Sequence, residues 1–153
     1  MDSRIYTGIP VGIVVLTELF FPYFYSLTCS KVWFSPHVHI CTLFFIALNV
    51  LLGFTLYEAD RINNTEIYVL AWVAFVLNLA WAHYIRRDDR YTLILLFLSL
   101  LVGYFIYNAI FLSSLTDNQN TLYLDLYSVY IIWLGFTITM VFEYANQKRR
   151  KLN

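Results

Sequence analysis

Charged side chains are scarce in this chain. Its 153 residues include 10 Lys and Arg and 10 Asp and Glu, which together make up 13% of the sequence. A soluble globular domain carries about 25% charged residues and about 45–50% apolar ones. Here 60% of the residues are hydrophobic. The composition therefore leaves no room for a water-soluble domain and indicates a protein that lies in a membrane.

Long stretches without charge account for this deficit. Five apolar runs cover residues 9–27, 39–57, 67–85, 91–115 and 122–144, and the second, third and fourth contain no Asp, Glu, Lys or Arg. A helix of about 20 residues crosses the hydrocarbon core. The runs lack the strict alternation of barrel strands, so backbone groups in lipid must be paired within helices. The sequence predicts an all-α integral membrane protein, with residues 1–153 forming one bundle of five transmembrane helices.

The basic residues predict the orientation of this bundle. Five spans place the two termini on opposite sides of the membrane. Eight of the ten basic residues then fall on one side, in the first loop (Lys31), the third loop (Arg86, Arg87, Arg90) and the C-terminal tail (Lys148, Arg149, Arg150, Lys151). Because loops rich in Lys and Arg stay on the cytoplasmic side, we expect the C-terminus inside and the N-terminus outside.

Cysteine is also rare. Cys29 and Cys41 are the chain's 2 cysteines, and both flank the first loop. Disulfide frameworks belong to oxidising compartments and to cysteine-rich chains. At a boundary that faces the cytoplasm, we expect two packed thiols.

A few polar and aromatic residues inside the spans point to a binding site. Asn78 and Trp81 share one face of the third span, and Trp133, Phe136 and Thr137 share one face of the fifth. The first loop, "SKVWFSPHVHIC", lies at the same end as Asn78 and is rich in aromatic residues. This pattern predicts a flat-walled apolar cavity under the loop, which suits a planar hydrophobic ligand.

Simpler interpretations of the same residues remain open. Trp and Tyr near a membrane boundary often serve only as interface anchors. Asn78 can be explained as an interhelical hydrogen-bond partner alone. Three histidines, His37, His39 and His83, lie near the same boundary, but no partner motif supports haem iron or another metal, and we predict no metal site. Glu18 in the first span is either functional or a protonated acid bonded to a neighbouring helix.

No nucleophile–base pair, phosphate loop or carboxylate dyad is visible, so the residues give no argument for an enzyme and none for nucleic-acid binding. Three motifs in order carry a family resemblance instead. The first motif, K-P-x-W-x-P-P followed by a glycine, is matched at Lys31, Pro36 and Gly53. The second motif, L-N-x-x-W-S, is matched at Leu77, Asn78 and Trp81. The third motif, P-Y-L-A-W-x-x-F, is matched at Tyr130, Trp133 and Phe136. The chain departs from the pattern at Val32, Phe34, His37, Ala82, Val129, Thr137, Met140 and Val141. On these motifs the chain resembles the TspO/MBR family, the tryptophan-rich sensory and translocator proteins.

The resemblance implies a membrane receptor or carrier that binds porphyrins, including haem, and in some members sterols or drug-like ligands, with no required cofactor. It implies a mitochondrial outer membrane or a bacterial-type envelope, and a homodimer is compatible with it. Carried over by position, the ligand-binding residues are Trp33, Phe34, Pro36, His37, Asn78, Trp81, Trp133, Phe136 and Thr137. Val141, Tyr144 and Lys148 fit a loose sterol motif.

Two other functions stay open at this point. Light- and oxygen-dependent porphyrin breakdown, with Trp81 and Trp133 near the ring, is implied by some members of the family. A structural or partner-binding protein without a small-molecule ligand is suggested by the small-residue spacing of Gly8 and Gly12.

Overall fold

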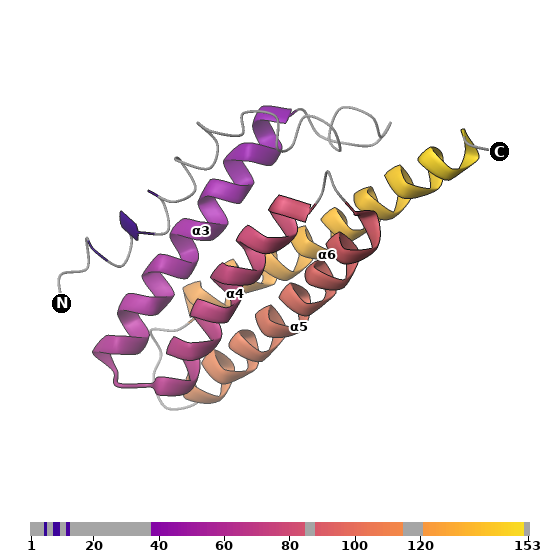
Figure 1. The fold of residues 1–153 in the computed structure, drawn as a ribbon. Coiled ribbons are helices and arrows are strands. Elements are labelled where there is room, and N and C mark those ends of the chain that lie inside the picture. Colours follow the sequence, from indigo (N-terminus) through magenta and orange to yellow (C-terminus); the bar gives the residue numbers. More distant parts are fainter. Residues whose placement is uncertain are drawn as a thin grey trace.

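The computed structural model describes residues 38–84, 88–114 and 121–151, together with Ile5, Gly8, Ile9 and Gly12. Four long helices occupy nearly all of the three main ranges: α3 (Val38–Arg61), α4 (Thr65–Tyr84), α5 (Asp89–Ser114) and α6 (Thr121–Arg150) (Figure 1). Each of the four is long and apolar enough to cross a membrane. The chain therefore has the helical architecture of a multi-pass integral membrane protein. The predicted first span, residues 9–27, falls almost wholly outside the described residues.

Two helices continue beyond their predicted apolar runs. α3 extends from the predicted end at residue 57 to Arg61, and α6 extends from residue 144 to Arg150. Both extensions consist mainly of polar residues, which form helix readily where the segment leaves the hydrocarbon. Arg61 also donates to the Glu58 carboxylate across one turn, at 2.9 Å from Nε.

A two-asparagine turn joins α3 to α4. Asn63 has a positive φ of 55°, in the left-handed region that asparagine tolerates better than most residues. Its N–H donates to the carbonyl of Asp60, and the N–H of Asn64 donates to the carbonyl of Ala59, which is the pattern of a Schellman cap. The Asn64 side chain then caps α4 by accepting the N–H of Ile67 at 3.1 Å. The turn is therefore short because each asparagine ends or begins a helix.

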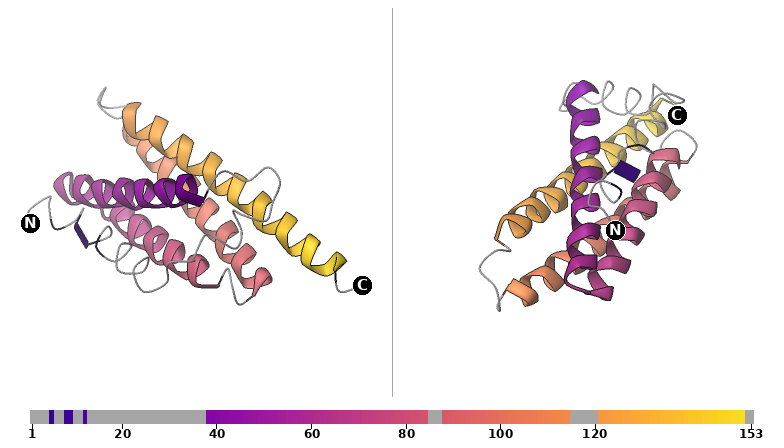
Figure 2. Two further views of the ribbon diagram at one scale, coloured as in Figure 1. Left: turned by 90° about the horizontal axis from the view of Figure 1, so that it is seen from above. Right: turned by 90° about the vertical axis from the view of Figure 1, so that its left-hand side faces the viewer.

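The four helices pack in chain order. α3 lies against α4, α4 against α5, and α5 against α6. Figure 2 shows α5 and α6 side by side, with α6 crossing near α3. The N-terminus of α5 is capped by Asp88, whose Oδ1 accepts the N–H groups of Arg90 and Tyr91. At the same end of the bundle, Lys148 of α6 pairs with Asp89 of α5 at 3.5 Å.

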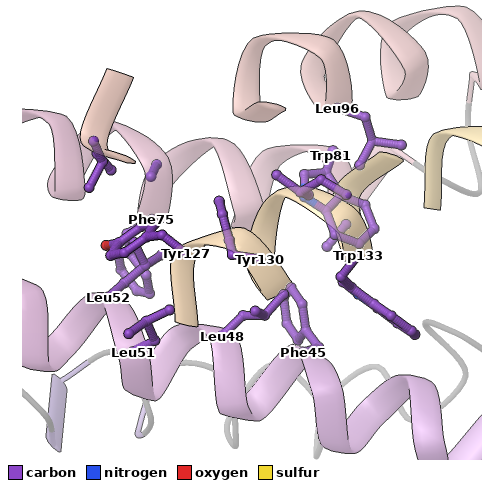
Figure 3. Close-up of a cluster of buried hydrophobic side chains, with 14 of the residues drawn as sticks. Phe45, Leu48, Leu51, Leu52, Phe75, Trp81, Leu96, Tyr127, Tyr130 and Trp133 are labelled. Carbon is purple, nitrogen blue, oxygen red and sulfur yellow. The ribbon is translucent and has the colours of Figure 1, made fainter. Parts of the chain in front are cut away.

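The outward faces are apolar. On α5 they include Ile94, Phe97, Leu101, Tyr104, Phe105 and Leu112, each about half exposed or more. Exposed apolar surface of this extent is expected where lipid, not water, covers the protein. The inward faces form a main core shared by all four helices, part of which is drawn in Figure 3, and a small second cluster of Leu56 and Ala71 between α3 and α4.

Gly103 sets how closely α5 approaches α6. A Cβ at this position would lie 2.7 Å from Cε1 and 3.0 Å from Cδ1 of the Tyr130 ring. Tyr130 is fully buried, so its ring has no open space to move into. A larger residue at 103 must therefore displace the ring or separate the helices.

We expect Gly103→Ala to lower the free energy of unfolding by about 1–3 kcal/mol, the usual cost of overpacking. Thermal unfolding of the detergent-solubilised protein, followed by circular dichroism, measures this. Gly135→Ala is the matched control, since nothing lies within 4 Å of a Cβ there. Equal melting temperatures for the two variants would show that the Tyr130 ring or α5 can shift to accommodate a Cβ at position 103 without loss of stability.

Candidate functional site

Asn78 is the centre of a buried polar cluster between α4 and α6. Its side chain is 1% exposed, although it lies in the middle of an apolar helix. The carboxamide oxygen accepts hydrogen bonds from Trp81 Nε1 and from the hydroxyl of Tyr130, both at 3.3 Å. The amide nitrogen Nδ2 has no partner among the described residues. Asn78 is thus both an interhelical link, as one interpretation of the sequence holds, and the source of an unused donor.

The face of α6 that meets this cluster is lined by buried residues at helical spacing. They are Tyr127, Tyr130, Trp133, Leu134, Thr137, Met140 and Val141. Tyr127 donates from its hydroxyl to Thr55 Oγ1 of α3 at 2.8 Å, one turn from the bond between Tyr130 and Asn78. Two tyrosines of α6 therefore reach in different directions, one to α3 and the other to α4, and hold α6 to both.

Trp133 provides a second unused donor. The residue is 8% exposed, and its indole Nε1 has no partner within the described ranges. The Phe44 ring of α3 lies flat against the indole, with centroids 4.3 Å apart and planes 8° apart. Phe136 lies beside it at 5.7 Å and a tilt of 39°. The indole therefore already carries one planar aromatic group on its face, in a stacked geometry.

The second tryptophan of the site, Trp81, belongs to the same buried core as Trp133, and Figure 3 draws both. Trp81 is 1% exposed and meets the edge of Phe45 at 5.7 Å and 79°. Thr137 is also buried, and its hydroxyl donates to the carbonyl oxygen of Trp133 at 2.9 Å. Because the Thr137 hydroxyl already donates to its own helix backbone, it is not available to a ligand. Among the described residues of this region, the unpaired donors are the N–H groups of Asn78 and Trp133.

The structure therefore brings together five of the predicted site residues: Asn78, Trp81, Trp133, Phe136 and Thr137. The other four, Trp33, Phe34, Pro36 and His37, lie outside the described residues. His83 is exposed, with its ring against Tyr84. In the parts of the chain that the structure describes, no group of three or more His, Cys, Asp or Glu residues is arranged to hold a metal ion.

The residues of the sterol motif do not share an exposed face. Val141 is 1% exposed and belongs to the core, and Tyr144 is half-buried. Lys148 is exposed and pairs with Asp89. A sterol at the lipid-facing surface of α6 would therefore not meet the valine of this motif.

The expectation of two packed thiols is wrong for Cys41. This residue is 0% exposed and disulfide-bonded. The chain's other cysteine, Cys29, lies outside the described residues. The closeness of two thiols in space, which allows a disulfide, is not visible in their sequence spacing.

Sequence reasoning missed three contributors. All three belong to α3. Phe44 stacks on Trp133, Thr55 accepts a hydrogen bond from Tyr127, and Asn49 is a buried carboxamide. Asn49 is fully buried; its Nδ2 donates to the carbonyl of Phe45 at 2.8 Å, and its Oδ1 has no partner within the described ranges. A carboxamide in an uncharged run is the one feature that identifies Asn49 from sequence alone.

The buried polar groups in the described part of the chain are hydrogen-bond donors and acceptors without formal charge. Every buried polar side chain in the described ranges is uncharged: Asn49, Thr55, Asn78, Thr92, Ser99 and Thr137. Two pockets lined by described residues lie elsewhere. One, of about 100 Å³, is lined by the α3–α4 turn, and the other, of about 270 Å³, by Trp72, Val73, Val76 and Leu77 on α4. A ligand that stacks on the indole face covered by Phe44 must displace the Phe44 ring.

Comparison of the chain with protein-family models, with curated proteins and with solved structures finds no match.

The bond between Tyr130 and Asn78 should appear as a coupling energy. We expect a double-mutant cycle of Tyr130→Phe and Asn78→Ala to give about 0.6 kcal/mol, and at most about 1.7, the range measured for such bonds in membranes. Reversible unfolding in mixed micelles gives the four free energies. The control cycle pairs Tyr130→Phe with Thr55→Ala, whose hydroxyl is bonded to Tyr127 instead. If the control cycle gave as large a coupling energy as the first, Asn78 would not be the hydrogen-bond partner of Tyr130.

Proposed function

We propose that this chain is a multi-pass membrane protein of the TspO/MBR type that binds a porphyrin between α3, α4 and α6. One observation carries the proposal. Two buried N–H donors, Asn78 Nδ2 and Trp133 Nε1, have no acceptor in the described residues and lie among stacked aromatic rings. An unpaired buried donor costs about 1–3 kcal/mol, so a ligand that accepts from both recovers this free energy on binding.

A porphyrin satisfies the shape of this region. Its flat macrocycle matches the plane that Phe44 now occupies on the Trp133 indole. In the proposed complex the macrocycle displaces Phe44 and stacks on the indole, with Trp81 and Phe136 at its edges. The buried surroundings are neutral, so one propionate enters as the protonated acid and accepts from Asn78 Nδ2 and Trp133 Nε1 at the edge of the indole, while the other propionate lies outside the buried region.

The first loop supplies the remaining part of the proposed site. Trp33, Phe34, Pro36 and His37 precede α3 directly, and α3 begins at Val38. Asn78 lies about 9 Å along α4 from the helix end at Tyr84. We assign the loop the role of a lid over this end of the bundle, where Lys31 or a histidine meets a propionate through a charge-assisted hydrogen bond. The family resemblance supports the same placement.

The proposal includes five spans and a cytoplasmic C-terminus. The support is the excess of Lys and Arg at the end of the bundle that holds the α6 C-terminus. The disulfide at Cys41 points the other way, because disulfides persist mainly in oxidising compartments. The charge asymmetry rests on eight of the ten basic residues, whereas the disulfide rests on one pair, so we give the charges the greater weight.

Protoporphyrin binding tests the site. In detergent micelles, we expect a saturable shift of the Soret band, and Trp133→Phe should weaken binding about 2- to 10-fold because one hydrogen bond is lost. Asn78→Ala should weaken binding by a similar factor. Trp72→Phe is the matched control, since Trp72 contacts Phe75 on another face of α4. Equal affinity in all four proteins would mean that porphyrin only partitions into the micelle.

The Phe44→Ala variant tests whether the macrocycle replaces the Phe44 ring or packs against it. Since the macrocycle takes the place of the Phe44 ring, removal of the ring should leave the affinity unchanged or increase it. Weaker binding in this variant would contradict the placement on Trp133 while leaving porphyrin binding itself intact.

The orientation is tested by a C-terminal reporter. A green fluorescent protein fused after residue 153 should be fluorescent, and alkaline phosphatase at the same position should be inactive, because the first folds inside the cell and the second requires export. The reverse pattern would place the basic end of α6 outside and make the disulfide the better topological signal.

A further inference from the structure

α6 is longer than a membrane requires. Its 30 residues extend about 45 Å, against a hydrocarbon core of about 30 Å. Figure 1 shows its C-terminal part projecting past the neighbouring ends of α4 and α5. The last turn carries Lys148, Arg149 and Arg150, and Lys151 follows. The helix therefore holds its basic residues in an ordered backbone beyond the bundle.

Two tyrosines mark the membrane boundary at this end. Tyr84 ends α4 and Tyr91 lies in the first turn of α5, with ring centroids 5.9 Å apart. Both are substantially exposed, at 39% and 59%. Tyrosines of this kind settle at the level of lipid headgroups. The pairing of Lys148 with Asp89 ties the basic part of α6 to the same level.

The carboxylates near this end are already engaged. Asp89 pairs with Lys148, and Asp88 accepts two backbone N–H groups at the start of α5. Glu143 accepts from the side chain of Gln147. Arg90, Arg149, Arg150 and Lys151 are exposed and have no ion-pair partner within the described ranges. This end of the bundle therefore has an excess of positive charge at the level of the lipid headgroups.

From this arrangement we infer that the C-terminal end of α6 binds the headgroups of anionic phospholipids. Arg149, Arg150 and Lys151 form the contact surface, with Arg90 beside the start of α5. Guanidinium groups bind phosphate oxygens in a bidentate manner, which fits a phospholipid headgroup. A basic residue beside an anionic membrane surface strengthens attraction roughly fivefold. The same contacts would anchor α6 at a fixed depth.

Native mass spectrometry of the full-length protein tests this surface. The protein in neutral detergent is titrated with phosphatidylserine or with phosphatidylcholine of the same acyl chains, and the retained lipids are counted. We expect phosphatidylserine to be retained at least tenfold more tightly. The triple variant Arg149→Gln, Arg150→Gln, Lys151→Gln should lose at least tenfold of this preference. Raising the salt concentration should reduce the preference as well.

Two further variants keep the result specific. Arg149→Lys with Arg150→Lys retains the charge and should keep most of the preference. Arg61→Gln removes an exposed cation at the opposite end of the bundle and should leave the preference unchanged. Equal retention of both lipids, an unaffected triple variant, or an equal loss in Arg61→Gln would each overturn the inference.

Discussion

The hydrogen bonds to the Asn78 carboxamide organise the interior of this bundle. One oxygen accepts from Trp81 on its own helix and from Tyr130 on α6. It thereby fixes the orientation of an indole and positions α6 against α4. In the same geometry the amide nitrogen finds no acceptor among the described residues. An interaction that stabilises the fold therefore also creates the polar feature that a ligand can use.

Lipid explains why so few polar contacts cross between helices. Most buried hydroxyl and amide groups donate to a carbonyl four residues earlier in their own helix, as Asn49, Thr55 and Thr137 do. Such bonds satisfy the donor without specifying a neighbour. The tyrosines of α6 instead reach α3 and α4, and Gly103 leaves space for one of them. Helix packing is therefore specified by a few large rings and one small residue.

Much of the fold could be predicted from composition because the hydrocarbon core imposes helices of a minimum length. The predicted runs match α3, α4, α5 and α6 except at their ends, where polar residues continue the helix into water. The shared face of Asn78 and Trp81 is confirmed, since both side chains are buried. Helical periodicity alone is sufficient for predictions of this kind.

Contacts between distant helices could not be predicted in the same way. Tyr127 and Thr55 are 72 residues apart, and Tyr130 and Asn78 are 52 apart. Their pairing depends on the relative rotation of whole helices, which periodicity leaves undetermined. The sequence indicates Tyr130 only through a motif, and it gives no signal for Phe44, because a phenylalanine in an apolar run does not stand out. The disulfide of Cys41 is likewise not predictable from sequence, since it depends on distance in space.

The indole N–H of Trp133 reports most directly on the central claim, that this bundle holds unused donors for a planar ligand. We would record the ¹⁵N–¹H spectrum of Trp-labelled protein in micelles, assign Trp133 with Trp133→Phe, and add protoporphyrin. We expect this resonance to change position when porphyrin is added, because the ring current of the stacked macrocycle acts on it, and we expect its exchange with solvent to slow as a hydrogen bond forms. A resonance that keeps its position and exchange rate at saturating porphyrin would show that the donor is not used, and would contradict the account.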